Sequence, residues 1–75
     1  MTLYIEVEDG KAITLVSRCL KNDNCFIDTF QVDKPKAKGQ HFQIVTTFRL
    51  PKGKSREEYQ HSIRELKGVV SINEI

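Results

Sequence analysis

The chain has 75 residues, of which 39% are hydrophobic and 29% are charged, and this balance is typical of one small soluble domain with a single core. Its formal net charge of +2 is too small to indicate a polyanionic partner by itself. No apolar run is long enough to span a bilayer, and acidic residues interrupt the first apolar stretch, so we expect neither direct membrane insertion nor a signal peptide.

The first third of the chain predicts a strand followed by a helix. Apolar and polar side chains alternate over residues 3–8, which is the period of a strand with one buried face. Asp9-Gly10 breaks this alternation. From Lys11 to about Leu20 the apolar residues follow helical spacing, and the Asn-Asp-Asn run at 22–24 favours a turn that ends the helix.

The next segment, roughly residues 25–32, predicts a second strand whose facing is ambiguous. It is rich in aromatic and β-branched side chains, but Ile27 lies opposite Phe26 and Phe30, which share a face with Asp28. A bulge, or an edge strand partly buried by a partner, would resolve this conflict. Residues 34–39 then predict a long hairpin turn.

The second half of the chain predicts a strand, a helix and a last strand. The strand covers residues 41–50 and is followed by a loop at 51–54. Ser55 and Glu58 form a capping box that starts the helix, and Gly68 is placed to end it in the left-handed conformation. The helix core stripe has the spacing i, i+4, i+7 and consists of Tyr59, Ile63 and Leu66. The last strand contains Val70 and Ile72.

The resulting order, β-α-β-β-α-β, predicts an α+β fold of the ferredoxin-like class. We expect a four-stranded antiparallel sheet with two helices on one face, in one domain that covers residues 1–75. Cys19 and Cys25 are the two cysteines, and their expected places in a helix and at the start of a strand favour buried thiols. Because disulfides are rare in the cytosol, two unpaired cysteines indicate a cytosolic, reducing compartment.

Nucleic-acid binding is not predicted. Basic residues cluster at 34–38 and at 52–56, but these two loops fall at opposite ends of the predicted sheet, so they fit solvated turns better than one continuous patch. An RNA-recognition module shares this element order and needs exposed aromatic residues on its third strand. Here the stacking position holds Gln40, and only Tyr4 offers a ring on the first strand.

Catalysis and metal binding are not predicted either. The serines have no neighbouring base, and Glu57-Glu58 suits the start of a helix better than an acid/base pair. Acylphosphatase-like enzymes of this fold need an arginine-containing anion loop after the first strand, where this chain has Asp9. Heavy-metal chaperones place two cysteines in that loop, and His41 and His61 lack partners at ligand spacing. We therefore expect a non-enzyme without a cofactor or a bound metal.

Three features carry a resemblance to a known family. They are the β-α-β-β-α-β order over the whole chain, the strand end Thr47-Phe48-Arg49-Leu50-Pro51, and the helix-to-strand run from Ile63 to Ile72. By these features the chain resembles ACT-type regulatory domains, and among them the C-terminal domain of MgtC/SapB-type membrane proteins. The resemblance implies the cytosolic tail of a longer inner- or plasma-membrane protein that is linked to magnesium limitation.

The resemblance also implies a candidate ligand loop. Amino-acid-binding ACT domains carry an Asp followed by Pro-Gly-Leu after the first strand. This chain has Asp9, Gly10 and Lys11 at that place, without the proline and the leucine.

Two function hypotheses follow, and the departure from the ligand motif favours the first. The first is an interaction or regulatory module that forms a homodimer or contacts its own membrane domain. Its predicted partner surface is Ile27 and Val45, on the outer face or edge of the sheet. The second is a small-molecule sensor of the amino-acid class that uses the ligand loop.

Overall fold

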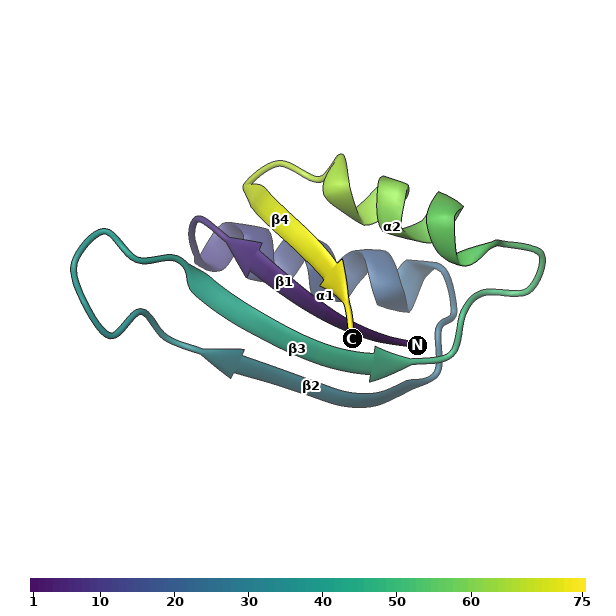
Figure 1. Cartoon of the computed structure of the whole chain (residues 1–75). Helices are drawn as coiled ribbons and strands as arrows, with labels where there is room; N and C mark the ends of the chain where they lie inside the picture. Colours follow the sequence, from purple (N-terminus) through teal and green to yellow (C-terminus); the bar gives the residue numbers. More distant parts are fainter.

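The computed structural model describes residues 1–75 and confirms the predicted fold class: two helices and one antiparallel sheet in β-α-β-β-α-β order (Figure 1). The elements are, in chain order, β1 (Thr2–Val7), α1 (Gly10–Asn22), β2 (Ile27–Asp33), β3 (Phe42–Phe48), α2 (Arg56–Arg64) and β4 (Val69–Glu74).

The four strands lie in the order β2-β3-β1-β4, so β1 and β3 are central and β2 and β4 are the edges. Figure 1 shows the β2–β3 hairpin turn and the β3–α2 loop at opposite ends of the molecule, as the sequence predicted for the two basic loops. In the central pair, Ile5 of β1 is opposite Ile44 of β3, and Tyr4 is opposite Val45. The Ile5–Ile44 pair is buried, whereas Tyr4 and Val45 are only half-buried, so the second pair lies on the open face of the sheet.

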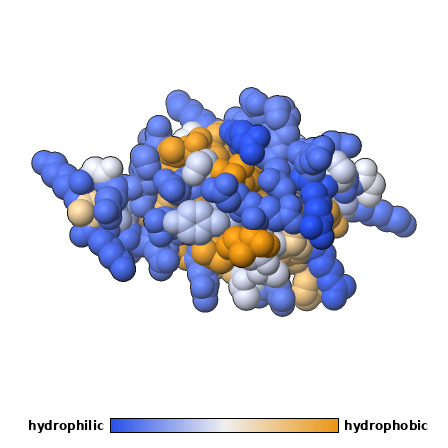
Figure 2. Space-filling view, in the orientation of Figure 1, coloured by the Kyte–Doolittle hydropathy of each residue, from blue (hydrophilic) through white to orange (hydrophobic).

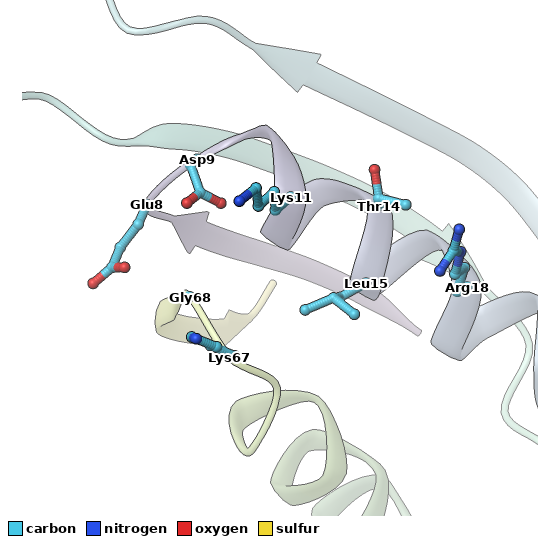
Figure 3. Close-up of a pocket in the computed structure, with 8 residues that line it drawn as sticks. All are labelled: Glu8, Asp9, Lys11, Thr14, Leu15, Arg18, Lys67 and Gly68. Carbon is cyan, nitrogen blue, oxygen red and sulfur yellow. The ribbon is translucent and has the colours of Figure 1, made fainter.

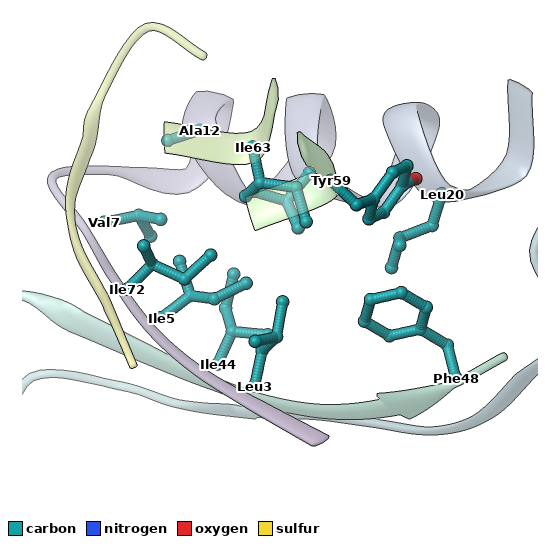
Figure 4. Close-up of a cluster of buried hydrophobic side chains, with 11 residues drawn as sticks. Leu3, Ile5, Val7, Ala12, Leu20, Ile44, Phe48, Tyr59, Ile63 and Ile72 are labelled. Atoms are coloured by element: carbon teal, nitrogen blue, oxygen red, sulfur yellow. The ribbon is translucent and has the colours of Figure 1, made fainter. Parts of the chain in front are cut away.

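The core fills the space between the sheet and the two helices (Figure 4). Each of the alternating apolar positions of β1 is buried, as the strand period predicted. Full burial of one such side chain stabilises the fold by about 1.5–3 kcal/mol. The core consists of Leu3, Ile5, Val7, Ala12, Val16, Leu20, Ile44, Phe48, Tyr59, Ile63 and Ile72.

Both helices begin at side-chain caps. Asp9 caps α1 by accepting a hydrogen bond from the Ala12 backbone N–H at 3.0 Å, and Ser55 caps α2 by accepting one from the Glu58 N–H at 3.2 Å. The prediction that Gly68 ends α2 was wrong, because the helix already ends at Arg64. Gly68 does have the expected positive φ, of +90°, but as the third residue of a separate turn closed by the Val69 N–H and the Leu66 carbonyl.

A bulge in β2 resolves the conflict in its facing. Ile27 is opposite Phe48 and Thr29 is opposite Thr47, so Asp28 is the extra residue. The extra residue moves Ile27 to the helix side of the sheet, where it packs against the core together with Phe30. The expected facing of Ile27 on the outer side of the sheet was therefore wrong, because a bulge reverses the alternation of side chains.

The last strand contains a similar irregularity. Glu6 is opposite Ser71 but Val7 is opposite Val69, which leaves Val70 as the extra residue. Val69 consequently packs against the core, whereas Val70, which the sequence places in the same strand, is 45% exposed. In the whole structure, neither helix combines the length and the hydropathy that crossing a bilayer requires.

Candidate functional site

The largest hollow of the molecule, about 390 Å³, lies beside the first turns of α1 (Figure 3). One wall is the exposed side of α1, and the other is the turn between α2 and β4. We call this hollow the α1 groove, and its lining residues are Glu8, Asp9, Lys11, Thr14, Leu15, Arg18, Lys67 and Gly68.

Close backbone packing holds the two walls of the α1 groove together. The Glu8 N–H donates to the Gly68 carbonyl oxygen at 2.8 Å. A Cβ on Gly68 would lie only 2.8 Å from the Cβ of Ala12 and 3.9 Å from Asp9 Oδ1. Because no side chain fits between the turn and the first turn of α1, glycine is required at position 68 both for this approach and for its positive φ. The wall therefore has a defined position relative to α1.

The charges around the α1 groove are mixed. Lys11 and Arg18 come from α1 and Lys67 comes from the turn, whereas the two carboxylates belong to Glu8 and Asp9. Figure 3 shows Glu8 extending away from α1. One oxygen of Asp9 accepts the capping hydrogen bond, so this carboxylate is oriented by the helix that it starts.

The hydrophobic part of the α1 groove is Leu15, which extends from α1 toward Lys67 and Gly68 in Figure 3. Leu15 is half-buried and is absent from the hydrophobic cluster that fills the core. This half-exposed leucine gives the groove a small apolar surface among its charged side chains, against which a small aliphatic group of a ligand could pack.

The structure brings together two of the three residues of the predicted ligand loop. Asp9 and Lys11 line the α1 groove, whereas Gly10 does not. Sequence reasoning missed Arg18 and Lys67. Arg18 could have been found, because it is seven residues after Lys11 and lies on the same face of the helix. Lys67 could not, because it reaches the groove only through tertiary packing.

The two residues of the predicted partner surface lie on opposite sides of the sheet. Val45 is on the open face next to Tyr4, but Ile27 packs on the core side. Figure 2 shows this open face as mostly hydrophilic, with hydrophobic atoms gathered near its centre. The exposed large hydrophobic side chains belong to the edge strands and their flanks: Phe26, Val32, Val70 and Ile75.

Two other polar arrangements lie on the surface outside the α1 groove. A second hollow, of about 340 Å³, lies in the β2–β3 hairpin and is lined by polar and charged residues such as Lys34 and Lys36, with no hydrophobic contribution other than Pro35. His41 Nδ1 is 3.4 Å from Glu6 Oε2 on the open face, in an exposed pair of small energetic weight. No group of three His, Cys, Asp or Glu side chains is arranged to hold a metal ion.

Comparison of the chain with protein-family models, with curated proteins and with solved structures found no match.

Proposed function

We propose that the chain is a non-catalytic regulatory domain of the ACT-like kind, and that it binds a small zwitterionic molecule of the amino-acid class in the α1 groove. The observation that carries the proposal is the meeting of opposite charges around one hollow, three cationic side chains and two carboxylates. A free amino acid offers a carboxylate to the cations and an ammonium group to the carboxylates, and hydrogen bonds between charged groups are the strong ones.

Ligand binding in the α1 groove would act on the whole domain. A molecule held by Arg18 and Lys67 would bridge α1 to the turn between α2 and β4. That turn is bonded to the end of β1 through Glu8 and Gly68. A ligand that binds only this folded arrangement stabilises it by mass action, so the ligand-bound domain is more stable than the free domain.

The resemblance to ACT-type domains supports this reading, and the resemblance to MgtC/SapB-type proteins extends it. We propose that the domain belongs on the cytosolic side of a membrane protein linked to magnesium limitation, where the ligand would regulate the membrane part. In this proposal magnesium is the physiological context and the α1 groove, with its three cations, is not a magnesium site.

A second candidate function is protein–protein contact through the open face of the sheet. It is favoured by the adjacent half-buried side chains of Tyr4 and Val45 at the centre of an otherwise polar face. Contact there would serve a second copy of the chain or the membrane part. Sedimentation at increasing concentration tests the first of these, because a chain that stays monomeric has no self-association through this face.

The experiment that tests the proposed function is a titration followed by amide NMR, with a panel of amino acids and with nucleotides and magnesium for comparison. We expect saturable shifts from one or more amino acids, centred on residues 9–12 and 67–69. No shift with any amino acid would overturn the ligand proposal and leave the second candidate.

A matched pair of variants tests the place of binding. Lys67→Gln removes one cation from the α1 groove, and losing a charged hydrogen bond is expected to weaken binding about tenfold or more. Lys36→Gln makes the same change of charge in the distant hairpin. We expect it to leave binding unchanged, and equal weakening by both variants would indicate an effect of net charge alone.

A further inference from the structure

The two thiols of the chain meet at one buried hydroxyl near the C-terminal end of α1. Cys25 Sγ donates to Tyr59 Oη at 3.3 Å, and Cys19 Sγ lies 3.8 Å from the same oxygen. The Cys19 thiol also donates to Asp23 Oδ2 at 3.7 Å. Tyr59 is fully buried, whereas both cysteines are free and half-buried. They are therefore more exposed than the sequence predicted.

The local backbone explains why the two thiols meet. Asn24 has a positive φ of 57°, the Cys25 N–H donates to the Leu20 carbonyl at 3.0 Å, and the Asn24 N–H donates to the Lys21 carbonyl at 3.1 Å. This is a Schellman ending of α1 with Asn24 as its left-handed residue. In such an ending the residue after the left-handed one packs against the last turn of the helix. That contact sets Cys25 against Cys19.

We propose that Cys19 and Cys25 are a redox-active pair that hydrogen peroxide oxidises to an intramolecular disulfide. The proposal is independent of the proposed function, because the pair shares no residue with the α1 groove. In the reducing compartment expected from the sequence, the disulfide would form transiently and be reversed by exchange with cellular dithiols.

Two steps give the disulfide. In the first, the Cys25 thiolate attacks one peroxide oxygen, the O–O bond breaks, and hydroxide leaves while Cys25 becomes a sulfenic acid. In the second, Cys19 Sγ attacks the Cys25 sulfur, the S–S bond forms and the S–O bond breaks. The Cys19 proton passes by way of the Asp23 carboxylate to the leaving hydroxyl group, which departs as water. The two sulfurs are oxidised, and the peroxide is reduced to two water molecules.

The neighbours of the thiols assign this order. Burial raises the pKa of Cys19, and the Asp23 carboxylate adds to the rise, although the hydrogen bond with Tyr59 acts against it. Cys19 therefore keeps its proton at neutral pH and suits the second step. Asp23 Oδ2, which already accepts the Cys19 S–H bond, is placed to take this proton as the sulfur attacks. Asp23 is a positioning residue in this scheme.

The test oxidises the reduced 75-residue chain with hydrogen peroxide and follows its intact mass. We expect the loss of two hydrogen atoms per chain, a Cys19–Cys25 cross-link in the peptide map, and a closure rate that does not depend on protein concentration. Disulfide-linked dimers as the main product, or persistence of both thiols while a denatured sample is oxidised, would overturn the proposal.

Single variants test the order of the steps. In Cys19→Ser the sulfenic acid on Cys25 has no resolving thiol, and we expect a reagent that traps sulfenic acids to label it. In Cys25→Ser we expect labelling of Cys19 to be about tenfold lower, because the protonated thiol is a poor nucleophile. Equal labelling would refute the assigned order. Circular dichroism checks that both variants fold.

Asp23→Asn keeps the shape of the side chain at the helix end and removes the carboxylate. We expect trapping at Cys25 to be unchanged while disulfide closure slows several-fold, with a steeper dependence on pH because hydroxide must now deprotonate Cys19. Equal slowing of both steps would show that Asp23 acts only on structure. Unchanged or faster closure would show that the carboxylate acts only by raising the pKa of Cys19, and either result would overturn its role.

Discussion

The hydroxyl of Thr46 donates a hydrogen bond of 2.8 Å to the carbonyl oxygen of Thr29. Thr46 is the one polar residue that is fully buried, and Thr29 is the first residue after the bulge in β2. A bulge disturbs the regular pairing of neighbouring strands, and a buried hydroxyl without a partner is costly. The buried threonine therefore supplies a hydrogen bond where the bulge disturbs the ladder.

Thr46→Val keeps the shape of the side chain and removes this donor. We expect the free energy of unfolding to fall by about 1–2 kcal/mol in urea titrations. Thr47→Val is the control on the opposite face. Its hydroxyl also makes a hydrogen bond, with Thr2 at 2.9 Å, but Thr47 is only half-buried, so water can replace the lost partner and the expected cost is about 0.5 kcal/mol or less. A more stable Thr46→Val protein would mean that burial of the hydroxyl costs more than its bond contributes.

The bulge also predicts that alanine substitutions at two neighbouring apolar residues lower the free energy of unfolding by different amounts. Ile27→Ala removes a side chain that packs on the core, and we expect a loss of about 2 kcal/mol. The Phe26 side chain is 64% exposed, and its ring lies 5.4 Å from the Arg49 guanidinium in a cation–π pair. Phe26→Ala is expected to cost about 1 kcal/mol or less. Thermal or urea unfolding measures both, and the reverse ranking would mean that the bulge is misplaced.

The contact of Gly68 with Ala12 gives a third prediction. Gly68→Ala places a Cβ on a residue with left-handed backbone, only 2.8 Å from the Cβ of Ala12. Gly53→Ala is the control, because Gly53 is also left-handed but has no atom within 4 Å of the added Cβ. The conformational cost is about 1–2 kcal/mol at either site. We expect Gly68→Ala to lose about 1–3 kcal/mol more in urea titrations, since the core must shift to relieve the overlap. Equal costs would contradict the close approach.

The Tyr59 hydroxyl predicts how stability changes with pH. Burial, followed by hydrogen bonds with Cys25, Asp23 and Cys19, raises the pKa of Tyr59, and burial also raises the pKa of Cys19. A raised pKa means that the folded chain holds these protons more tightly than the unfolded chain. The resulting stabilisation is complete below the pKa values of the unfolded chain, about 8.5 for a thiol and about 10 for a phenol, and is lost as pH rises above them.

Urea unfolding at a series of alkaline pH values checks this behaviour. We expect the free energy of unfolding to decline from about pH 8.5 upward in the native sequence. Tyr59→Phe is expected to flatten the decline above about pH 10. Tyr4→Phe changes the other tyrosine, on the open face, and should leave the decline as it was. If the free energy of unfolding depends on pH in the same way in the native chain and in Tyr59→Phe, Tyr59 is not the cause of the decline.

The sequence predicted the elements better than their boundaries and facings. The alternation in β1 and the helical spacing in α1 were strong signals, because each element has one fully buried face. The conflicting faces in residues 25–32 indicated a bulge as one explanation but not which residue is extra, so Ile27 was placed on the wrong face. The irregularity at Val70 was not predicted, because nothing in the short last strand conflicts with a regular alternation. Gly68 was recognised as left-handed, but a glycine after a helix and a glycine in a following turn look alike.

The candidate site was less predictable than the fold. Asp9 and Lys11 are adjacent to the first strand and could be found as a loop. Lys67 joins them only because Gly68 lets its turn touch the first turn of α1. The meeting of Cys19 with Cys25 followed from the left-handed conformation of Asn24, which the Asn-Asp-Asn run indicated only as a turn.

The central position of β1 has a consequence for how the domain acquires its structure. The first strand of the chain pairs with β3 on one side and with β4, the last strand, on the other. Only the β2–β3 hairpin is a local pair, and pairing between distant segments slows folding. A nascent chain therefore cannot complete its sheet until residues 69–74 have been made. We expect a chain truncated after Gly68 to lack cooperative unfolding, so the domain folds as one late event and not strand by strand.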